Sequence, residues 1–281
     1  MSDSSHYFVP ANSKWPIYTS LSMFLVVSGF ICIFNELSGA YAVFGAGFLA
    51  LTYCMVGWWR DVTVESEGGK YKEWEDMSFR WSMGWFIFSE VMFFVSFFGA
   101  LFYARVLAVP DLGGLDSKVI WPQFEAIWPT AGPYFPDNFE TIPAFDVPLV
   151  NTLILLTSGV TVTWAHWALK LNKRRQLNIG LALTVLLGVI FLAFQVQEYV
   201  HAYNDLNLRL DSGIYGSTFF MLTGFHGLHV TIGTISLIVI LGRCMAGHFT
   251  PDKHFGFEAV AWYWHFVDVV WLFLFIVVYW L

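Results

Sequence analysis

The chain has 281 residues, of which 57% are apolar and 12% charged, and its formal net charge is −7. The charged fraction is about half that of an ordinary soluble domain, which excludes a soluble globular protein. The basic residues form no patch attached to a nucleic-acid-reading module, so no nucleic acid is expected as a partner.

Seven segments are long and apolar enough to cross a bilayer, which takes about 20 mostly apolar residues. In chain order they lie at residues 16–35, 40–59, 79–106, 148–170, 177–202, 216–242 and 257–280. The sequence therefore predicts an all-α polytopic membrane protein with seven transmembrane helices. The N-terminal segment, residues 1–15, lacks the basic start of a cleavable signal peptide, so the first span is expected to stay in the protein.

The most charged stretch separates two groups of predicted helices. Residues 60–78 follow a two-helix membrane unit at 16–59 and precede a five-helix unit at 79–281. Because this stretch is too polar to enter the bilayer, we expect an aqueous connector. The longest loop, residues 107–147, is acidic and proline-rich, which excludes a long helix. Its Trp121 and Trp128 predict that the loop packs against the rest of the protein.

The basic residues predict which way the chain crosses the membrane. Seven spans put eleven of the 14 basic residues on the side of the N-terminus and three, Arg105, Lys118 and Arg209, on the other. Cytoplasmic loops carry an excess of lysine and arginine. We therefore expect the N-terminus and the 60–78 connector inside, and the C-terminus and the acidic loop outside.

Glu90 stands alone among apolar residues near the middle of the third span. An ionisable group at that depth is functional or paired, because a lone charge in a bilayer is unfavourable by several kcal/mol. Three interpretations fit the sequence: a proton relay, a polar point that lines a cleft, and a hydrogen bond between helices.

Further polar residues lie in the fifth, sixth and last spans. In the last span, positions 258, 262 and 265 fall on one helical stripe, with position 268 at its edge. We expect the polar residues to form a network that joins the helices of the bundle. Its predicted members are Gln197, Glu198, His201, His226, His229, Glu258, His265 and Asp268.

The sequence also raises the question of a metal site. His226 and His229, three residues apart, have a spacing that can hold a metal, but a metal needs further ligands. The helices are crowded with phenylalanine and tryptophan, which leaves little room for a haem. The cysteines, Cys32, Cys54 and Cys244, form no C-x-x-C pair. We therefore expect hydrogen bonds between helices rather than a metal or haem in this chain.

The loop at residues 243–257 combines basic and aromatic side chains at the level of the lipid headgroups. Such a cluster suits a lipid phosphate, although ordinary anchoring of the helix ends explains its basic residues equally well. Trp58, Trp59 and Arg60 end the second span on the same predicted side.

Four stretches carry a resemblance to a known family: residues 58–62, 89–94, 224–230 and 254–271. Over nearly its whole length the chain resembles subunit III of the cytochrome c oxidases, in the haem–copper oxidase superfamily. The resemblance implies seven helices grouped two plus five around a V-shaped cleft that holds phospholipid. The expected lipid-binding residues are Trp58, Trp59, Arg60, Glu90, Arg243, His248, Lys253, His254 and Phe255.

By the same resemblance the chain is an accessory core subunit, without a cofactor or catalytic residues of its own, of a proton-pumping oxidase. That complex passes electrons from cytochrome c to oxygen, and its haem and copper lie in the partner subunits I and II. The subunit's implied roles are to support proton uptake, to stabilise the catalytic subunit and to keep phospholipid bound.

Two alternatives remain from the residues alone. One is a self-contained proton-coupled transporter that uses Glu90, Glu198 and Glu258, although the chain shows no internal repeat. The other is a membrane cytochrome in its own right. Mitochondrial members of the family commonly have arginine where this chain has Val64, and a histidine-rich stretch at 68–71. These departures, the long 107–147 loop and the absence of an import sequence favour a bacterial inner membrane.

Overall fold

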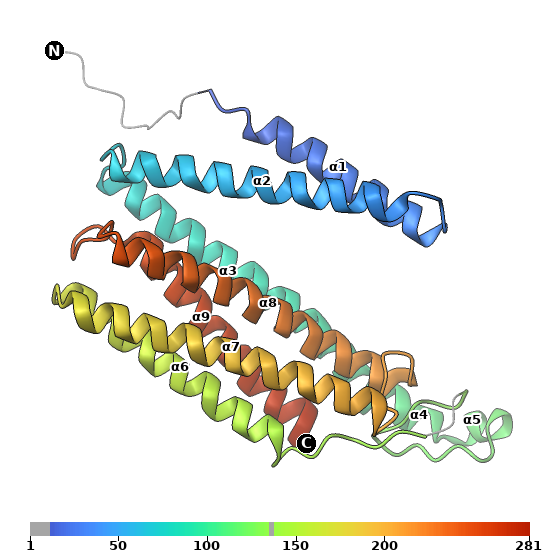
Figure 1. Ribbon diagram of the computed structural model, residues 1–281. Helices are drawn as coiled ribbons and strands as arrows, with labels where there is room; N and C mark the ends of the chain where they lie inside the picture. Colours follow the sequence, from blue (N-terminus) through green and yellow to red (C-terminus); the bar gives the residue numbers. More distant parts are fainter. Residues whose placement is uncertain (1–11, 135–137) are drawn as a thin grey trace. The chain divides into compact units, whose positions relative to one another are not determined.

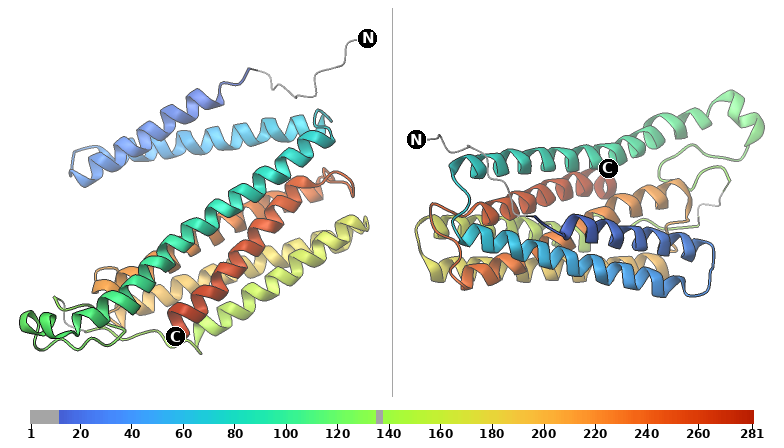
Figure 2. Two further views of the ribbon diagram at one scale, coloured as in Figure 1. Left: turned by 180° about the vertical axis from the view of Figure 1, so that it is seen from behind. Right: turned by 90° about the horizontal axis from the view of Figure 1, so that it is seen from above.

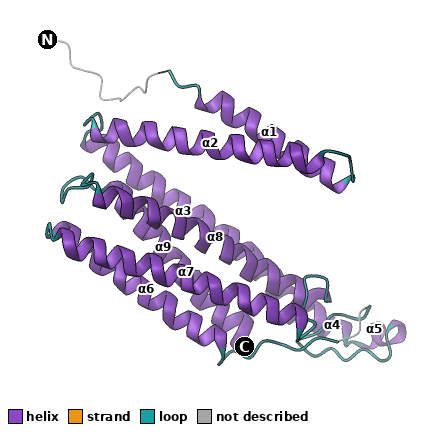
Figure 3. Ribbon diagram, viewed as in Figure 1, coloured by secondary structure: helices purple, strands orange, loops and turns teal. Residues whose placement is uncertain are grey.

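The computed structural model describes residues 12–134 and 138–281, and over these residues it contains helices and loops but no strand (Figure 3). In chain order the helices are α1 Trp15–Phe34, α2 Ala40–Glu67, α3 Glu73–Phe102, η1 Tyr103–Ala108, α4 Val109–Leu112, α5 Leu115–Ile120, α6 Val147–Lys170, α7 Arg174–Asn204, α8 Gly213–Met245, α9 Phe255–Leu274 and η2 Phe275–Trp280. The elements η1 and η2 are π-helical ends of α3 and α9. Most of the N-terminal segment 1–15, and Pro136 in the long loop, lie outside the described residues.

Among the described residues, seven helical runs are long and apolar enough to cross a membrane, which confirms the predicted number of spans. The chain is therefore a multi-pass membrane protein. Its contacts divide it into two units, residues 1–79 and 80–281. The first contains α1, α2 and the start of α3, and the second contains the remaining helices. A V-shaped cleft between a pair and a group of five helices stays a prediction.

Two helices reach further into the charged stretch than the apolar spans predict. Helix α2 continues past residue 59 to Glu67, and α3 begins at Glu73 rather than at 79. Glu73, Glu75 and Asp76 lie in the first turn of α3, where negative side chains are favourable beside the positive end of the helix dipole. Gly69, with φ +69°, lies in the break between the two helices. The hydropathy of the sequence shows where a helix enters the lipid but not where the helix ends. Here the break between the two helices lies at a glycine.

In the first unit, α1 and α2 pack antiparallel at close range (Figure 1). Gly29 lies directly against the backbone of Phe44, where a Cβ atom would come within 2.5 Å of the Phe44 Cα. Small residues of this kind let transmembrane helices approach closely. Beyond α2, the Tyr71 phenol donates a 2.9 Å hydrogen bond to Glu65. Burial and this carboxylate raise the pKa of Tyr71 to about 12, so the phenol keeps its proton at physiological pH.

In the second unit, α9 is the most enclosed helix. Of the 18-residue apolar stretch that identifies each span, 56% is buried in α9, against 39% or less in every other span. It packs against both α6 and α8, and seen from behind it runs between α3 and α6 (Figure 2). Trp264 and Trp271 of α9 are fully buried. Gly188 of α7 and Gly233 of α8 make room for the Trp264 indole, since a Cβ atom at either glycine would come within 2.9 Å of it.

The long loop packs against the connection between α7 and α8, as the tryptophans predict. Trp128 lies edge-on to Tyr215, with 5.6 Å between the ring centroids. The amides of Ile214 and Tyr215 donate to the carbonyls of Ala131 and Thr130 at 3.1 and 3.3 Å. These bonds fix the loop over the start of α8.

Candidate functional site

The polar residues at membrane depth in the second unit form separate clusters rather than the single network that the sequence predicts. The reason is their depth along the helices. Helix α8 lies between α7 and α9 in the chain and runs back across the membrane, so α7 and α9 run in the same direction. Glu198 near the end of α7 therefore meets Tyr279 near the end of α9, whereas Glu258 lies 21 residues earlier, about 30 Å away along the helix.

The first cluster pairs Glu90 of α3 with His229 of α8. Glu90 Oε2 lies 2.9 Å from His229 Nε2. The pair is largely enclosed, with 22% of the Glu90 side chain and 11% of the His229 side chain exposed. The rings of Phe93 and Phe94 lie against His229, at 5.8 and 5.0 Å between centroids. Of the three interpretations of Glu90, the hydrogen bond between helices is present.

His229 also contacts its own helix. Its Nδ1 lies 2.6 Å from the Phe225 carbonyl oxygen, which can only accept, so Nδ1 is the donor of this bond. Nε2 is thereby left for Glu90, and the imidazole ring bridges α8 and α3.

His226 lies one turn from His229 but takes no part in this pair. It is 1% exposed, and neither ring nitrogen has a hydrogen-bond partner among the described residues. Its ring lies against Phe191 and Trp271 instead. Within residues 12–134 and 138–281, no three histidine, cysteine or acidic side chains come close enough together to hold a metal ion.

The second cluster surrounds Glu198, which is 2% exposed. Its Oε1 accepts hydrogen bonds from Tyr279 at 2.6 Å and from Gln195 at 3.0 Å. Two other predicted members of the network face outward from α7. Gln197 is exposed, and His201 pairs at 2.7 Å with the exposed Asp205. Neither reaches Glu258 or His265.

The third cluster lies where α3 and α9 begin. The Arg80 guanidinium donates to Glu258, and both side chains are mostly buried, with 31% and 15% exposed. The same guanidinium lies over the Phe255 ring, 5.8 Å from its centroid. Glu258 therefore serves as the counter-charge of an arginine, a partner that its own helical stripe could not reveal.

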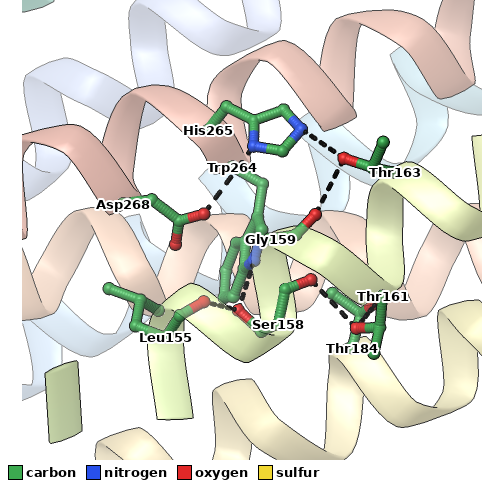
Figure 4. Close-up of polar contacts among 9 residues, drawn as sticks. All are labelled: Leu155, Ser158, Gly159, Thr161, Thr163, Thr184, Trp264, His265 and Asp268. Atoms are coloured by element: carbon green, nitrogen blue, oxygen red, sulfur yellow. Dashed lines mark hydrogen bonds and ion pairs between the residues drawn. The ribbon is translucent and has the colours of Figure 1, made fainter. Parts of the chain in front are cut away.

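The fourth cluster lies between α6 and α9 (Figure 4). The Trp264 indole donates to Ser158 at 2.9 Å, and Thr163 Oγ1 lies 3.2 Å from His265 Nε2. His265 Nδ1 lies 3.7 Å from Asp268 Oδ2, which is longer than a direct hydrogen bond. Asp268 is 6% exposed, whereas 45% of the His265 side chain is exposed.

Gly159 provides the space for the Asp268 carboxylate, because a Cβ atom there would come within 2.3 Å of Oδ2. Gly159→Ala is therefore expected to destabilise the second unit by about 1–3 kcal/mol through overpacking. The matched control is Gly227→Ala on α8, where a Cβ atom meets nothing within 4 Å. The measurement is the thermal unfolding temperature of each variant chain in detergent. Equal temperatures for the two variants would contradict the packing account.

The predicted lipid-binding residues lie in both units. In the first unit, Trp58 and Trp59 are 43% and 53% exposed, and Arg60 is exposed. In the second unit, the Arg243 guanidinium lies 4.4 Å from the centroid of the Phe249 ring.

The remaining predicted lipid-binding residues of the second unit differ in exposure. Lys253 is exposed, and His248 and Phe255 are partly buried. His254, by contrast, is 8% exposed, with its ring against that of His166 at 5.4 Å between centroids. The chain itself therefore covers most of the surface that His254 was expected to offer a lipid.

Sequence reasoning missed three partners: Arg80 for Glu258, Tyr279 for Glu198, and Thr163 for His265. Arg80 was counted only as one of the basic residues on the side of the N-terminus, although its position about two turns inside α3 was the available signal. Tyr279 and Thr163 carry no charge, and nothing in the sequence separates them from the other tyrosines and threonines.

Comparisons with known proteins agree with one another. The family model for cytochrome c oxidase subunit III matches residues 5–281. The cytochrome c oxidase subunit 3 of Danio rerio is 44% identical over 282 residues, covering 100% of this chain and 99% of the relative. Those of Prototheca wickerhamii and Drosophila melanogaster are 42% and 44% identical, each covering 95% of this chain and 94% of the relative.

Proposed function

The chain belongs to the cytochrome c oxidase subunit III family, and on that basis we propose that it is an accessory core subunit of a proton-pumping respiratory oxidase. The observation that carries the proposal is the family match from residue 5 to residue 281, which covers nearly the whole chain. The oxidase transfers electrons from cytochrome c to oxygen. This subunit's part is to support proton uptake and to stabilise the catalytic subunit.

In this proposal the partners are a catalytic subunit I and a copper-bearing subunit II, which hold the haem and copper, while cytochrome c binds the complex as a whole. The competing transporter hypothesis has no support, since the relatives are named as oxidase subunits. Its three carboxylates, Glu90, Glu198 and Glu258, also have separate partners rather than a shared path.

We further propose that each unit binds phospholipid. In the first unit, the exposed indoles of Trp58 and Trp59 beside Arg60 suit the headgroup level of a membrane. In the second unit, the exposed Lys253 together with Arg243 supplies positive charge for a lipid phosphate. His254 contributes through packing, because its ring is buried.

The membrane and the orientation are also part of the proposal. The distribution of basic residues supports an N-terminus inside and a C-terminus outside. Val64 and the stretch 68–71 support a bacterial inner membrane. The similar relatives nevertheless include proteins from animals, Danio rerio and Drosophila melanogaster, each 44% identical to this chain.

Purification of the tagged chain from its native membrane in mild detergent tests the assignment. The expected result is co-elution with larger partner subunits that show visible haem absorption. A colourless, stable monomer that moves a solute across vesicles would overturn the proposal in favour of a transporter. Haem absorption retained by the chain after its separation from all partners would indicate a cytochrome instead.

Glu90→Gln is expected to leave assembly and the initial turnover nearly unchanged. The amide keeps a polar contact with His229, and no haem or copper depends on this residue. The measurements are the haem and copper content of the purified complex and its initial rate of oxygen consumption. Loss of either metal centre in this variant would contradict an accessory role.

A further inference from the structure

One face of α9 in the second unit remains open between α3 and α6. Figure 2, seen from behind, shows α9 running between these two helices. The residues on this face follow a helical stripe, His265, Val269, Leu272 and Ile276, which we call the α9 face. Val269 and Ile276 are 51% and 42% exposed, although α9 is otherwise the most buried span.

His265 lies at membrane depth wherever the bilayer is placed along this helix. The run Phe255–Trp280 has 26 residues and is therefore about 38 Å long. His265 lies about 15 Å from its start, so a hydrocarbon core of about 30 Å always includes it. Since 45% of its side chain is exposed, the imidazole is open to the surroundings at that depth.

The chain does not complete the hydrogen bonds of this polar pair. His265 Nε2 lies 3.2 Å from Thr163 Oγ1, but its Nδ1 is 3.7 Å from Asp268 Oδ2, beyond the length of a direct hydrogen bond. Asp268 is itself more than nine-tenths buried, with 6% of its surface exposed. Lipid tails offer no hydrogen bond, and ionisable residues within spans face protein or a polar cavity rather than lipid. The pair therefore indicates a polar partner on the α9 face.

An apolar groove adjoins the α9 face on the side of α3. Its volume is about 590 Å³, and Val269 belongs to both the groove and the stripe. Phe98 of α3 and Phe273 of α9 line its walls, and Arg105 lies at one end, donating to the carbonyls of Val277 and Leu281. A groove that follows two helices accepts large apolar side chains projecting from a third helix, as in other helix packing.

We infer that the α9 face docks a transmembrane helix of a partner subunit, which places a hydrogen-bonding side chain opposite His265 and a large apolar side chain in the groove. The inference rests on the proposed function, because that function supplies the partner. It goes further in naming the surface and the chemistry of its occupant.

Photo-cross-linking in the native membrane tests the surface. Benzoylphenylalanine at Val269 is expected to form a covalent adduct with a partner subunit. The matched position is Ile235 on α8, which is 54% exposed against 51% for Val269. Adducts from position 269 only with lipid, only within this chain, or with a partner at position 235 alone would each overturn the inference.

A second variant tests the polar contact. His265→Leu is expected to lower the amount of this chain retained with the haem-bearing subunits at least fivefold after a detergent wash. The control is His201→Leu, an outward histidine with 52% of its side chain exposed, which should retain the wild-type amount. Unchanged retention of the His265 variant would overturn the polar contact. Throughout, co-purification of the wild-type chain with haem reports separately on the proposed function.

Discussion

Trp264→Ala is expected to destabilise the second unit by about 3–5 kcal/mol, the range for removing a large side chain from a closed core. The indole is fully buried and packs directly against Gly188 and Gly233, which have no side chains to fill the cavity that its removal leaves. The change also leaves Ser158 without its 2.9 Å indole donor.

Thiol labelling of Cys244 gives a readout confined to this unit, because Cys244 is 2% exposed and the other cysteines lie in the first unit. The labelling rate in Trp264→Ala should rise by two orders of magnitude or more, since about 1.4 kcal/mol corresponds to a tenfold change. The control is Trp167→Ala, which removes an indole that is 65% exposed. Similar labelling in both variants would show that Trp264 does not hold the bundle together.

Arg80→Met is expected to destabilise the second unit by about 2–3 kcal/mol, somewhat less than for a fully buried ion pair because both side chains are partly exposed. The loss comes mainly from the Glu258 carboxylate, which remains at the start of α9 without its counter-charge. The Phe255 ring also loses its cation.

The double variant Arg80→Met with Glu258→Gln distinguishes this account from simple loss of packing. It should be more stable than Arg80→Met alone, because it removes the unpaired charge, and the coupling energy should reach about 1–3 kcal/mol. The measurement is again the labelling rate of Cys244. Additive effects of the two changes would mean that the two side chains do not act as a pair.

The fold was largely predictable because it follows from one strong signal. Twenty-residue apolar runs have few alternatives in a bilayer, so seven helices could be counted from the sequence. The helix ends could not be placed in the same way. Helix α2 continues to Glu67 and α3 starts at Glu73, because a helix can extend beyond the bilayer into water where its residues are polar. Only Gly69, with its positive φ, marked the break.

Glu90, Glu198 and Glu258 each bond to a residue of another helix, but the sequence did not reveal these partners. A helical stripe tells which side chains share a face, and it says nothing of the depth at which a neighbouring helix meets them. Counting residues from the span ends would have placed Glu198 near Tyr279 and far from Glu258. The pairing of Glu90 with His229 needed more, because only the packing of α3 against α8 decides which residues at mid-depth meet.

The docking of the long loop has a consequence for how the protein is made. Ala131 and Thr130 bond to Ile214 and Tyr215, which follow them by more than 80 residues in synthesis. At Gly213 the loop and the start of α8 lie so close together that a Cβ atom would come within 2.1 Å of the Ala131 carbonyl oxygen. The bonds of Thr130 and Ala131 therefore cannot form until the start of α8 has been synthesised. This part of the loop remains undocked while α6 and α7 enter the membrane.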